Sequence, residues 1–181
     1  MATTNARPAS TANPNAGMRM SPQALEAMRN TEKVVLKYYN DMGRNRGNCT
    51  WGIGFYVHKG VCTPEELERK VTAPSIELEY VKRVAEAERR VKIKVKVKLN
   101  QAQFDSLVSF TYNTANVTNE RVYQALNDNN FQAAAQRISE ANKVRVKGQL
   151  KLAPGLVKRR EEESAPFRTM GKSETAARAI K

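Results

Sequence analysis

The chain has 181 residues, of which 40% are hydrophobic, so it is long enough for one catalytic domain with a sizeable core that could be split into two lobes. Lys and Arg number 31 against 18 Asp and Glu, and this surplus of 13 positive charges favours attraction to nucleic acid, acidic lipid or bacterial wall polymer without choosing among them. No apolar run approaches the roughly 18 to 20 residues that cross a bilayer, which argues against membrane insertion.

The two ends of the chain lack apolar periodicity. Residues 1–20 are rich in Ala, Thr, Asn and Pro and contain no apolar stretch typical of a secretory signal. We therefore expect a flexible N-terminal tail, or alternatively a delivery or docking segment, and a protein made in the cytoplasm without a signal peptide. Residues 169–181 are expected to form a C-terminal tail.

The first helix is predicted to begin at Ser21, which suits an N-cap, with Pro22 at the first helical position. Leu25, Met28 and Glu32 then share one helical face, because they are spaced by three and four residues. A carboxylate thus lies near the end of an otherwise apolar stripe.

Between residues 39 and 60 the pattern changes. Asp, Gly and Asn residues are interleaved with Trp51, Ile53, Phe55 and Val57, which alternate with residues of other types. This alternation predicts a small sheet with tight turns.

Two cysteines, Cys49 and Cys62, flank the glycine-rich part of this stretch. From the residues alone they are either free thiols or the ends of a closed loop, since a disulfide requires an oxidising compartment. Two cysteines with one nearby histidine, His58, lack an obvious fourth ligand. No metal site is therefore predicted.

Further helices follow from local start signals. Thr63 before Pro64, with Glu66 completing a capping box, predicts a second helix start, and helix is expected to resume from Pro74. Residues 91–98 alternate strictly between aliphatic residues and lysine. Their period predicts a strand, whereas their position between helical patterns favours a helix end followed by a connector, and both interpretations stay open.

The C-terminal half has mainly helical patterns. Asn100 and Gln103 form another cap-like start, and the apolar face of a buried central helix follows at Phe104, Leu107, Val108 and Thr111. Helical spacing continues from 122 to 138, interrupted by the polar run 127–130, and a last helix is expected to open near Pro154.

Two carboxylates could serve glycoside hydrolysis, which needs a proton donor beside the leaving oxygen and a second carboxylate for the attacking water. Glu32 stands beside Val34, Val35 and Leu36, where partial desolvation would raise its pKa toward the acid role. Asp41, in a polar Asn-Asp-Met-Gly turn, is expected to stay ionised. On spacing alone, a surface acid and a turn former remain the simpler interpretation.

A wider pattern changes that balance. Its members are Glu32, Tyr39, Asp41, Gly43, Thr50, Gly52, Ile53 and Gly54. A Glu followed nine positions later by an Asp, and then by Thr-x-Gly-x-Gly, resembles the signature of the phage-type lysozymes, which are endolysin-like muramidases similar to glycoside hydrolase family 24. The later parts of that family's pattern are matched in order by Leu99, Gln101, Gln103, Phe104, Leu107, Val108, Phe110, Asn113, Gly155, Leu156, Val157, Arg159, Arg160 and Glu163.

The resemblance implies an α+β, mostly helical fold with a lysozyme-like arrangement of two lobes. The catalytic domain would span residues 21–168. A small sheet-containing lobe would cover 21–75 and a helical lobe 76–168, with the polysaccharide bound in the cleft between them.

The resemblance also implies roles for individual residues. Glu32 would be the general acid, Asp41 would orient or activate the attacking water, and Thr50 would help hold that water. The implied reaction is hydrolysis, with inversion, of the β-1,4 bond between N-acetylmuramic acid and N-acetylglucosamine, without metal or organic cofactor. On the same grounds the substrate-binding residues would be Asn113, Gly52 and Phe55.

Four positions depart from the family pattern. Lys33 stands where the family has a glycine after the catalytic Glu, and its ammonium would lower the pKa of that acid unless it points away. Phe55 replaces the family's histidine, and His58, three residues later, is expected to be a surface or hairpin residue. Thr114 and Ala115 replace the usual Val-Gly after the central helix, in a loop near the expected cleft.

Cys49 and Cys62 flank the hairpin as in a subgroup of this family, which implies a disulfide that stiffens the strand of Thr50. That subgroup includes phage lysins and antibacterial effectors delivered by secretion machines. The expected partners are therefore peptidoglycan and an immunity protein or a secretion-machine or holin protein. We expect a monomer that acts in the periplasm or on the wall of the target bacterium.

Two alternatives remain. Lys33 and Phe55 leave room for a lytic transglycosylase or for a protein that binds glycan without cutting it. The surplus charge and the lysines between Lys92 and Lys98 suggest a nucleic-acid-binding protein. The sequence has no recognisable nucleic-acid-binding motif or aromatic-basic platform, so no nucleic-acid partner is predicted.

Overall fold

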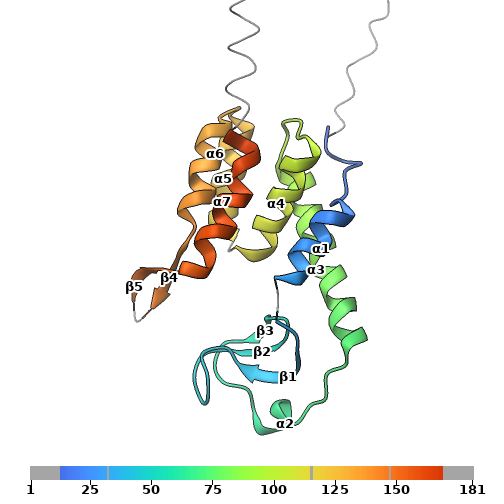
Figure 1. Ribbon diagram of the computed structural model, residues 1–181, viewed down its shortest axis with the longest axis vertical. Helices are drawn as coiled ribbons and strands as arrows, with labels where there is room; N and C mark the ends of the chain where they lie inside the picture. The colour runs from blue at the N-terminus through green and yellow to red at the C-terminus, as the bar shows by residue number, and fades with distance from the viewer. Residues whose placement is uncertain (1–12, 32, 115, 147, 169–181) are drawn as a thin grey trace, which may run out of the picture. The chain divides into compact units, whose positions relative to one another are not determined.

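The computed structural model describes residues 13–31, 33–114, 116–146 and 148–168 (Figure 1). The chain divides into two compact units. We call residues 20–88 the sheet unit, and residues 1–19 together with 89–181 the helical unit. The boundary between them falls inside the long helix α3 (Ala73–Lys94).

The sheet unit begins with α1 (Pro22–Asn30), whose start confirms the predicted cap. The side chain of Ser21 accepts a hydrogen bond from the backbone N–H of Ala24 at 3.2 Å, and Pro22 lies in the first turn. Such a cap satisfies one of the backbone donors that a helix start leaves without a partner, and it stabilises the helix by about 1 kcal/mol.

Three antiparallel strands follow in the order β1-β2-β3 (Figure 1). Their bounds are β1 (Val35–Asn40), β2 (Cys49–Gly52) and β3 (Phe55–His58). Thr50 pairs with Tyr39 on one side and with Tyr56 on the other, which makes β2 the central strand. The predicted small sheet is confirmed, although β1 begins four residues before residue 39.

The sheet unit ends with the short helix α2 (Pro64–Leu67) and the first part of α3. The predicted capping box is present, because the backbone N–H of Thr63 donates to Glu66 at 2.7 Å and that of Glu66 donates to the Thr63 hydroxyl at 3.2 Å. The side chains that form the core of this unit are Met28, Ile53, Phe55, Ile76, Tyr80 and Val84.

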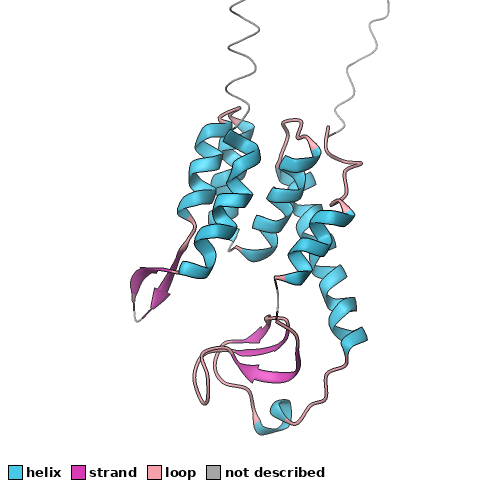
Figure 2. Cartoon of the chain, viewed as in Figure 1, coloured by secondary structure: helices cyan, strands magenta, loops and turns pink. Residues whose placement is uncertain are grey.

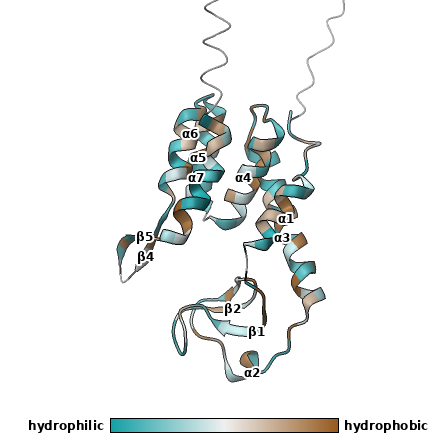
Figure 3. Ribbon diagram, viewed as in Figure 1, coloured by the Kyte–Doolittle hydropathy of each residue, from teal (hydrophilic) through white to brown (hydrophobic). Residues whose placement is uncertain are grey.

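The helical unit consists mainly of helices (Figure 2). They are α4 (Gln101–Asn113), α5 (Asn116–Asn127), α6 (Phe131–Glu140) and α7 (Pro154–Arg168). α4 packs against α7, and α6 packs against both α5 and α7. Hydrophobic and hydrophilic residues alternate along these helices (Figure 3). The largest apolar side chains buried between them are Phe104, Leu107, Phe110, Leu126, Ile138 and Phe167.

Each such side chain removed from water stabilises the fold by about 1.5–3 kcal/mol. The capping box predicted at Asn100 and Gln103 is present at the start of α4. None of the helices in the described part of the chain is long and apolar enough to span a membrane.

A two-stranded hairpin lies between α6 and α7, and the sequence analysis did not anticipate it. Its strands are β4 (Lys143–Val146) and β5 (Gln149–Leu152), with Lys143 opposite Leu152 and Val144 opposite Lys151. The alternation of polar, mostly cationic residues with aliphatic ones on both sides of a Lys-Gly pair was the available signal.

The alternating run 91–98 is a helix end followed by a connector, as one of the two interpretations held. α3 continues to Lys94, and no regular structure follows until α4. Val91, Val95 and Leu99 are buried. The spacing from Val91 to Val95 is helical, because the N–H of Val95 still donates to the carbonyl oxygen of Val91, whereas Leu99 is buried from the irregular connector.

Residues 13–20 depart from the flexible tail expected for them. Asn15 is fully buried, its side-chain amide donates to the carbonyl oxygens of Val95 and Val97 at 3.2 and 2.8 Å, and its Oδ1 accepts from the N–H of Leu99 at 3.0 Å. Because the connector after α3 has no regular structure, these bonds satisfy backbone groups that would otherwise have no partner. Residues 1–12 and 169–181 lie outside the described residues.

Candidate active site

Asp41 stands at the start of the loop between β1 and β2, and one residue, Asn48, anchors it. The backbone N–H of Asp41 donates to the carbonyl oxygen of Asn48 at 3.1 Å. In return, the backbone N–H of Asn48 donates to Oδ1 of Asp41 at 2.8 Å and its side-chain amide donates to Oδ2 at 3.2 Å. These bonds close the loop and set the orientation of the carboxylate.

Gly47 leaves space for this carboxylate. It has a positive φ of +88°, which favours glycine. A β-carbon at this position would lie 2.0 Å from Oδ1 of Asp41 and 2.7 Å from the backbone nitrogen of Met42. Any other residue would therefore collide with the carboxylate as well as strain the backbone.

Thr50 lies on the central strand and is 4% exposed. Its hydroxyl donates a long hydrogen bond of 3.4 Å to the carbonyl oxygen of Asn48. That carbonyl also accepts the backbone N–H of Asp41. Asn48 thus links the two residues that the sequence analysis singled out on this hairpin.

The sequence analysis missed Asn48 and Gly47. The glycine lies in an Arg-Gly-Asn run that is typical of a turn, which was the available signal for it. No spacing rule marks the asparagine, because its bonds to Asp41 depend on how the loop closes.

Glu32, the expected general acid, lies outside the described residues, so its role stays a prediction. Lys33 beside it is exposed.

Gly52 is buried with φ +63°, and a β-carbon there would lie 3.1 Å from the ring of Phe55 and 3.2 Å from Ile76. A glycine at this turn lets the strand end pack closely on α3.

Phe55 is 1% exposed, and its contact with substrate stays a prediction. Its ring meets Trp51 edge-on with 5.0 Å between the centroids, and the guanidinium of Arg83 lies 4.7 Å from its centroid. The residue at the family's histidine position is therefore a core residue in this chain. Its ring is buried in an apolar environment and joins the hairpin to α3.

Asn113, the remaining predicted substrate-binding residue, belongs to the helical unit. It ends α4, and its Oδ1 accepts a hydrogen bond from Nη2 of Arg160 at 3.3 Å. Arg160 is itself 2% exposed and is paired with Glu163. The pair fixes the amide of Asn113, and its contact with substrate stays a prediction.

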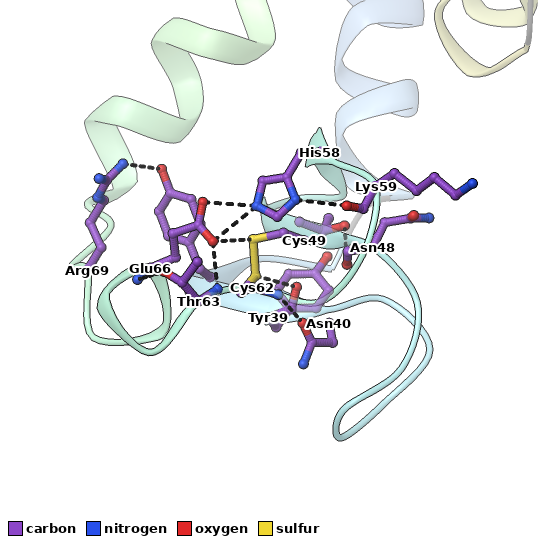
Figure 4. Close-up of polar contacts among 12 residues, drawn as sticks. Tyr39, Asn40, Asn48, Cys49, His58, Lys59, Cys62, Thr63, Glu66 and Arg69 are labelled. Carbon is purple, nitrogen blue, oxygen red and sulfur yellow. Dashed lines mark hydrogen bonds and ion pairs between the residues drawn. A yellow bond between two sulfur atoms is a disulfide. The ribbon is translucent and has the colours of Figure 1, made fainter.

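A disulfide joins Cys49 to Cys62, which confirms the expectation drawn from the family resemblance (Figure 4). The backbone N–H of Cys62 donates to Oδ1 of Asn40 at 2.8 Å. Cys49 directly precedes Thr50, and Asn40 directly precedes Asp41. The disulfide loop is therefore attached to the strand residues next to both members of the candidate site.

His58 and Glu66 form an ion pair beside the disulfide (Figure 4). Nε2 of His58 lies 3.1 Å from both carboxylate oxygens, and Nδ1 lies 3.1 Å from the carbonyl oxygen of Lys59. The bond to Lys59 and then the bond to Glu66 raise the pKa of His58. The backbone bond from Thr63, followed by the bond from His58, lowers the pKa of Glu66.

The same corner brings together Cys49, His58 and Glu66, whose ligand atoms lie within 4.8 Å of one another. The sulfur of Cys49 is bonded to Cys62, so it is not available as a thiolate ligand. One imidazole and one carboxylate remain, and both are occupied by their mutual pairing. This group therefore has too few donors to form a structural metal site.

Comparisons with known sequences give one consistent family. A family model described as phage lysozyme matches residues 29–163. The endolysin of Bacillus phage B103 is 32% identical over 166 residues, which represent 89% of this chain and 58% of that protein. The chain therefore spans less than two thirds of the length of this curated relative.

Solved structures show the same fold. The endolysin from Escherichia coli O157:H7 phage FAHEc1 is similar with a TM-score of 0.68 and 27% identity, covering 85% of this chain and 96% of that one. The muramidase domain of SpmX from Asticaccaulis excentricus is similar in fold, with a TM-score of 0.65 and 22% identity, covering 83% and 98%. The α+β, mostly helical lysozyme-like fold expected from the sequence is thereby confirmed.

Proposed function

The chain belongs to the phage lysozyme family, and we propose that it is a peptidoglycan muramidase that hydrolyses the β-1,4 bond between N-acetylmuramic acid and N-acetylglucosamine. The observation that carries this proposal is the hairpin on which Asn48 holds both the carboxylate of Asp41 and the hydroxyl of Thr50. The family's pattern contains an acid and a threonine at these positions.

The proposed reaction uses three side chains. Glu32 protonates the leaving oxygen, while Asp41 accepts a hydrogen bond from the attacking water and increases its nucleophilicity. Each carboxylate oxygen of Asp41 accepts one bond from Asn48, which leaves further lone pairs for water. Thr50 stands on the strand opposite the end of β1 and adds a hydroxyl to hold that water.

The net charge of +13 supports attraction to the anionic wall of bacteria, which raises the rate of encounter. The rate of lysis should then fall as ionic strength rises, because salt screens exposed charges. We further propose that the enzyme acts in the periplasm or on the wall of a target bacterium, and that an immunity protein, a holin or a secretion machine is its physiological partner.

The test is the loss of turbidity of purified peptidoglycan. Glu32→Gln and Asp41→Asn should abolish clearing, whereas Glu26→Gln, which neutralises an exposed acid on α1, should not. Mass spectrometry of the products should show reducing ends. Anhydro ends would instead identify a lytic transglycosylase, and intact walls together with tight, salt-sensitive DNA binding would identify a nucleic-acid-binding protein.

A further inference from the structure

The corner beside the disulfide holds four side chains of the types that bind metal ions, Cys49, His58, Cys62 and Glu66 (Figure 4). As long as the disulfide is closed, its two sulfurs are not thiolates, and only one imidazole and one carboxylate remain as donors. Reduction changes this count, because each sulfur then becomes a thiol that can lose its proton. The reduced chain therefore offers four donors, which is the number that a structural zinc site needs.

Local structure brings these donors together. Cys49 on β2 pairs with His58 on β3, because the register of the two strands shifts by one residue directly after Cys49. Such a shift moves a side chain to the other face of a sheet, so it places His58 on the side of Cys49. Glu66 stands three residues after the N-cap Thr63, and the capping box turns its carboxylate back toward the backbone next to Cys62. Two short-range features thus account for both pairs of donors.

The distances between the donor atoms suit a tetrahedral ion. Sγ of Cys49 lies 3.6 Å from Oε2 of Glu66, and Nε2 of His58 lies 3.1 Å from both carboxylate oxygens. The ligand atoms of these three residues all lie within 4.8 Å of one another. Zinc bonds of about 2.0 Å to nitrogen or oxygen and about 2.3 Å to sulfur place tetrahedral donors about 3.3–3.8 Å apart. Small side-chain rotations therefore bring the donors to bonding distance of one ion.

Hydrogen bonds around the donors already orient them for a metal. Nδ1 of His58 lies 3.1 Å from the carbonyl oxygen of Lys59, and because a carbonyl can only accept, Nδ1 carries the proton. Nε2, which faces Glu66, is then the nitrogen that binds either a second proton or a metal ion. A metal-bound histidine usually donates its other N–H to a carbonyl or carboxylate in this way. The N–H of Thr63 donates to Oε2 of Glu66 at 2.7 Å, which leaves further lone pairs on the carboxylate.

We propose that the reduced protein binds one Zn²⁺ at this corner through two thiolates, one imidazole and one carboxylate, supplied by Cys49, Cys62, His58 and Glu66. Both cysteines are buried, whereas the side chain of His58 is 41% exposed, so the ion enters past the imidazole. A dithiol reductant opens the disulfide by giving up two electrons and two protons, and it becomes a disulfide itself. Zn²⁺ then displaces both thiol protons. The ion and the disulfide are alternative crosslinks, one for a reducing and one for an oxidising compartment.

This site goes beyond the proposed function, because none of its ligands takes part in bond cleavage. It nevertheless adjoins the candidate active site. Cys49 directly precedes Thr50, and the N–H of Cys62 donates to Asn40, which directly precedes Asp41. A zinc ion that holds both cysteines thus keeps these two strand positions in place while the sulfurs are reduced.

Metal titrations of the full chain test the site. Protein that is reduced with a phosphine and desalted without oxygen should bind one Co²⁺, with the visible absorption of a tetrahedral ion and the near-ultraviolet band of thiolate-to-cobalt charge transfer. Zn²⁺ should displace the cobalt, and the oxidised protein should show neither band. Absence of both bands in the reduced protein, or equal bands in the oxidised protein, would overturn the proposal.

Two neighbouring acids on α2 provide the variant and its control. Glu66→Gln keeps an oxygen that accepts the cap bond but removes the charged ligand, and it should weaken Zn²⁺ binding more than about 100-fold, beyond the usual cost of losing an outer-shell partner. Glu65→Gln removes the same charge from an exposed residue that is not a ligand, so it should bind like the native protein. If Glu66→Gln binds as tightly as the native protein, two cysteines alone hold the ion and the four-ligand site is wrong.

Two further measurements do not depend on spectra. Urea unfolding of the reduced native protein should shift to higher concentration when Zn²⁺ replaces a chelator, because an ion that binds only the folded state stabilises it, and Glu66→Gln should lose this shift. Oxidised glutathione should release one Zn²⁺ for each disulfide formed, since exchange converts it to two reduced glutathione molecules. An unchanged midpoint, or a disulfide that forms while the zinc stays bound, would refute the site.

Discussion

Asn48 donates one hydrogen bond to each carboxylate oxygen of Asp41, from its backbone N–H at 2.8 Å and from its side-chain amide at 3.2 Å. A carboxylate held at both oxygens by one neighbour cannot rotate freely. The same asparagine accepts from the hydroxyl of Thr50 through its carbonyl oxygen. Asn48 is therefore a positioning residue for the proposed water-binding pair, although it has no part in proton transfer.

Removing the side chain of Asn48 should lower activity more than stability. In Asn48→Ala, Asp41 keeps the backbone bond but loses the amide bond to Oδ2, so the carboxylate gains rotational freedom. We expect kcat to fall about tenfold with little change in KM, and the free energy of unfolding to fall by about 1 kcal/mol. Kinetics of wall hydrolysis should show this, and Arg44→Ala, an exposed change in the same loop, should leave kcat unchanged.

Alanine variants at two glycines of the β1–β2 loop distinguish the effect of backbone strain from the effect of a steric collision with Asp41. Gly43 and Gly47 have φ values of +92° and +88°, so alanine at either position should cost about 1 kcal/mol of stability through backbone strain, and Gly47→Ala should cost more because of its collision. Only a β-carbon at 47 meets Asp41, since nothing lies within 4 Å of one at 43. Activity should collapse in Gly47→Ala alone. Thermal unfolding and wall clearing, measured on both variants, would contradict this account if activity fell equally.

Reduction of the disulfide should destabilise the sheet unit. Cys49 and Cys62 are 13 residues apart, and opening a loop of that length costs about 3 kcal/mol in the chain-entropy model. Urea unfolding of the native protein should therefore shift to lower concentration when a reductant is added. A double variant with alanine at both positions should unfold early with or without reductant. If the urea midpoint of the native protein does not change when the reductant is added, other contacts hold the loop.

The pair of His58 and Glu66 should give the fold a pH-dependent stability. The pKa of His58 is raised from 6.5, so its contribution is complete below pH 6.5 and is lost as pH rises through the folded value. The pKa of Glu66 is lowered from 4.5, so its contribution is complete above pH 4.5 and is lost as pH falls through the folded value.

The stability difference between the native protein and His58→Gln should therefore be largest at about pH 5.5 and should shrink toward alkaline pH. Melting temperatures of both proteins measured across this range provide the test. A difference in melting temperature that is constant from acid to alkaline pH would mean that His58 stabilises the fold by packing and not by its charge.

Asn15 should contribute to the stability of the helical unit. Asn15→Ala removes two bonds to backbone carbonyls and leaves the buried N–H of Leu99 without its acceptor. The expected loss in free energy of unfolding is about 2–4 kcal/mol, because a buried donor without a partner keeps its full desolvation cost. Urea unfolding measures it, and Gln132→Ala, an exposed change on α6, should cost less than about 0.5 kcal/mol.

Much of the fold could be predicted because its signals are local. The caps at Ser21, Thr63 and Asn100 each involve a side chain and a backbone group three residues apart, so the sequence states both partners. The hairpin of Thr50 could be predicted from its glycines and alternating apolar residues. The family pattern added the disulfide between Cys49 and Cys62, which the residues alone left open.

The sequence by itself determined the helix starts, the small sheet, the family and the three residues proposed for catalysis, because those features depend on near neighbours or on an ordered pattern. Only the tertiary structure decided that α3 ends within residues 91–98 and that Phe55 is buried. It also decided that Asn15 provides hydrogen-bond partners for the backbone of the connector after α3. The same holds for the bonds by which Asn48 holds Asp41 and for the meeting of His58 and Glu66 beside the disulfide. The physical reason is that burial and hydrogen-bond partners depend on which segments pack together. The spacing of apolar residues along a segment does not specify which other segments pack against it.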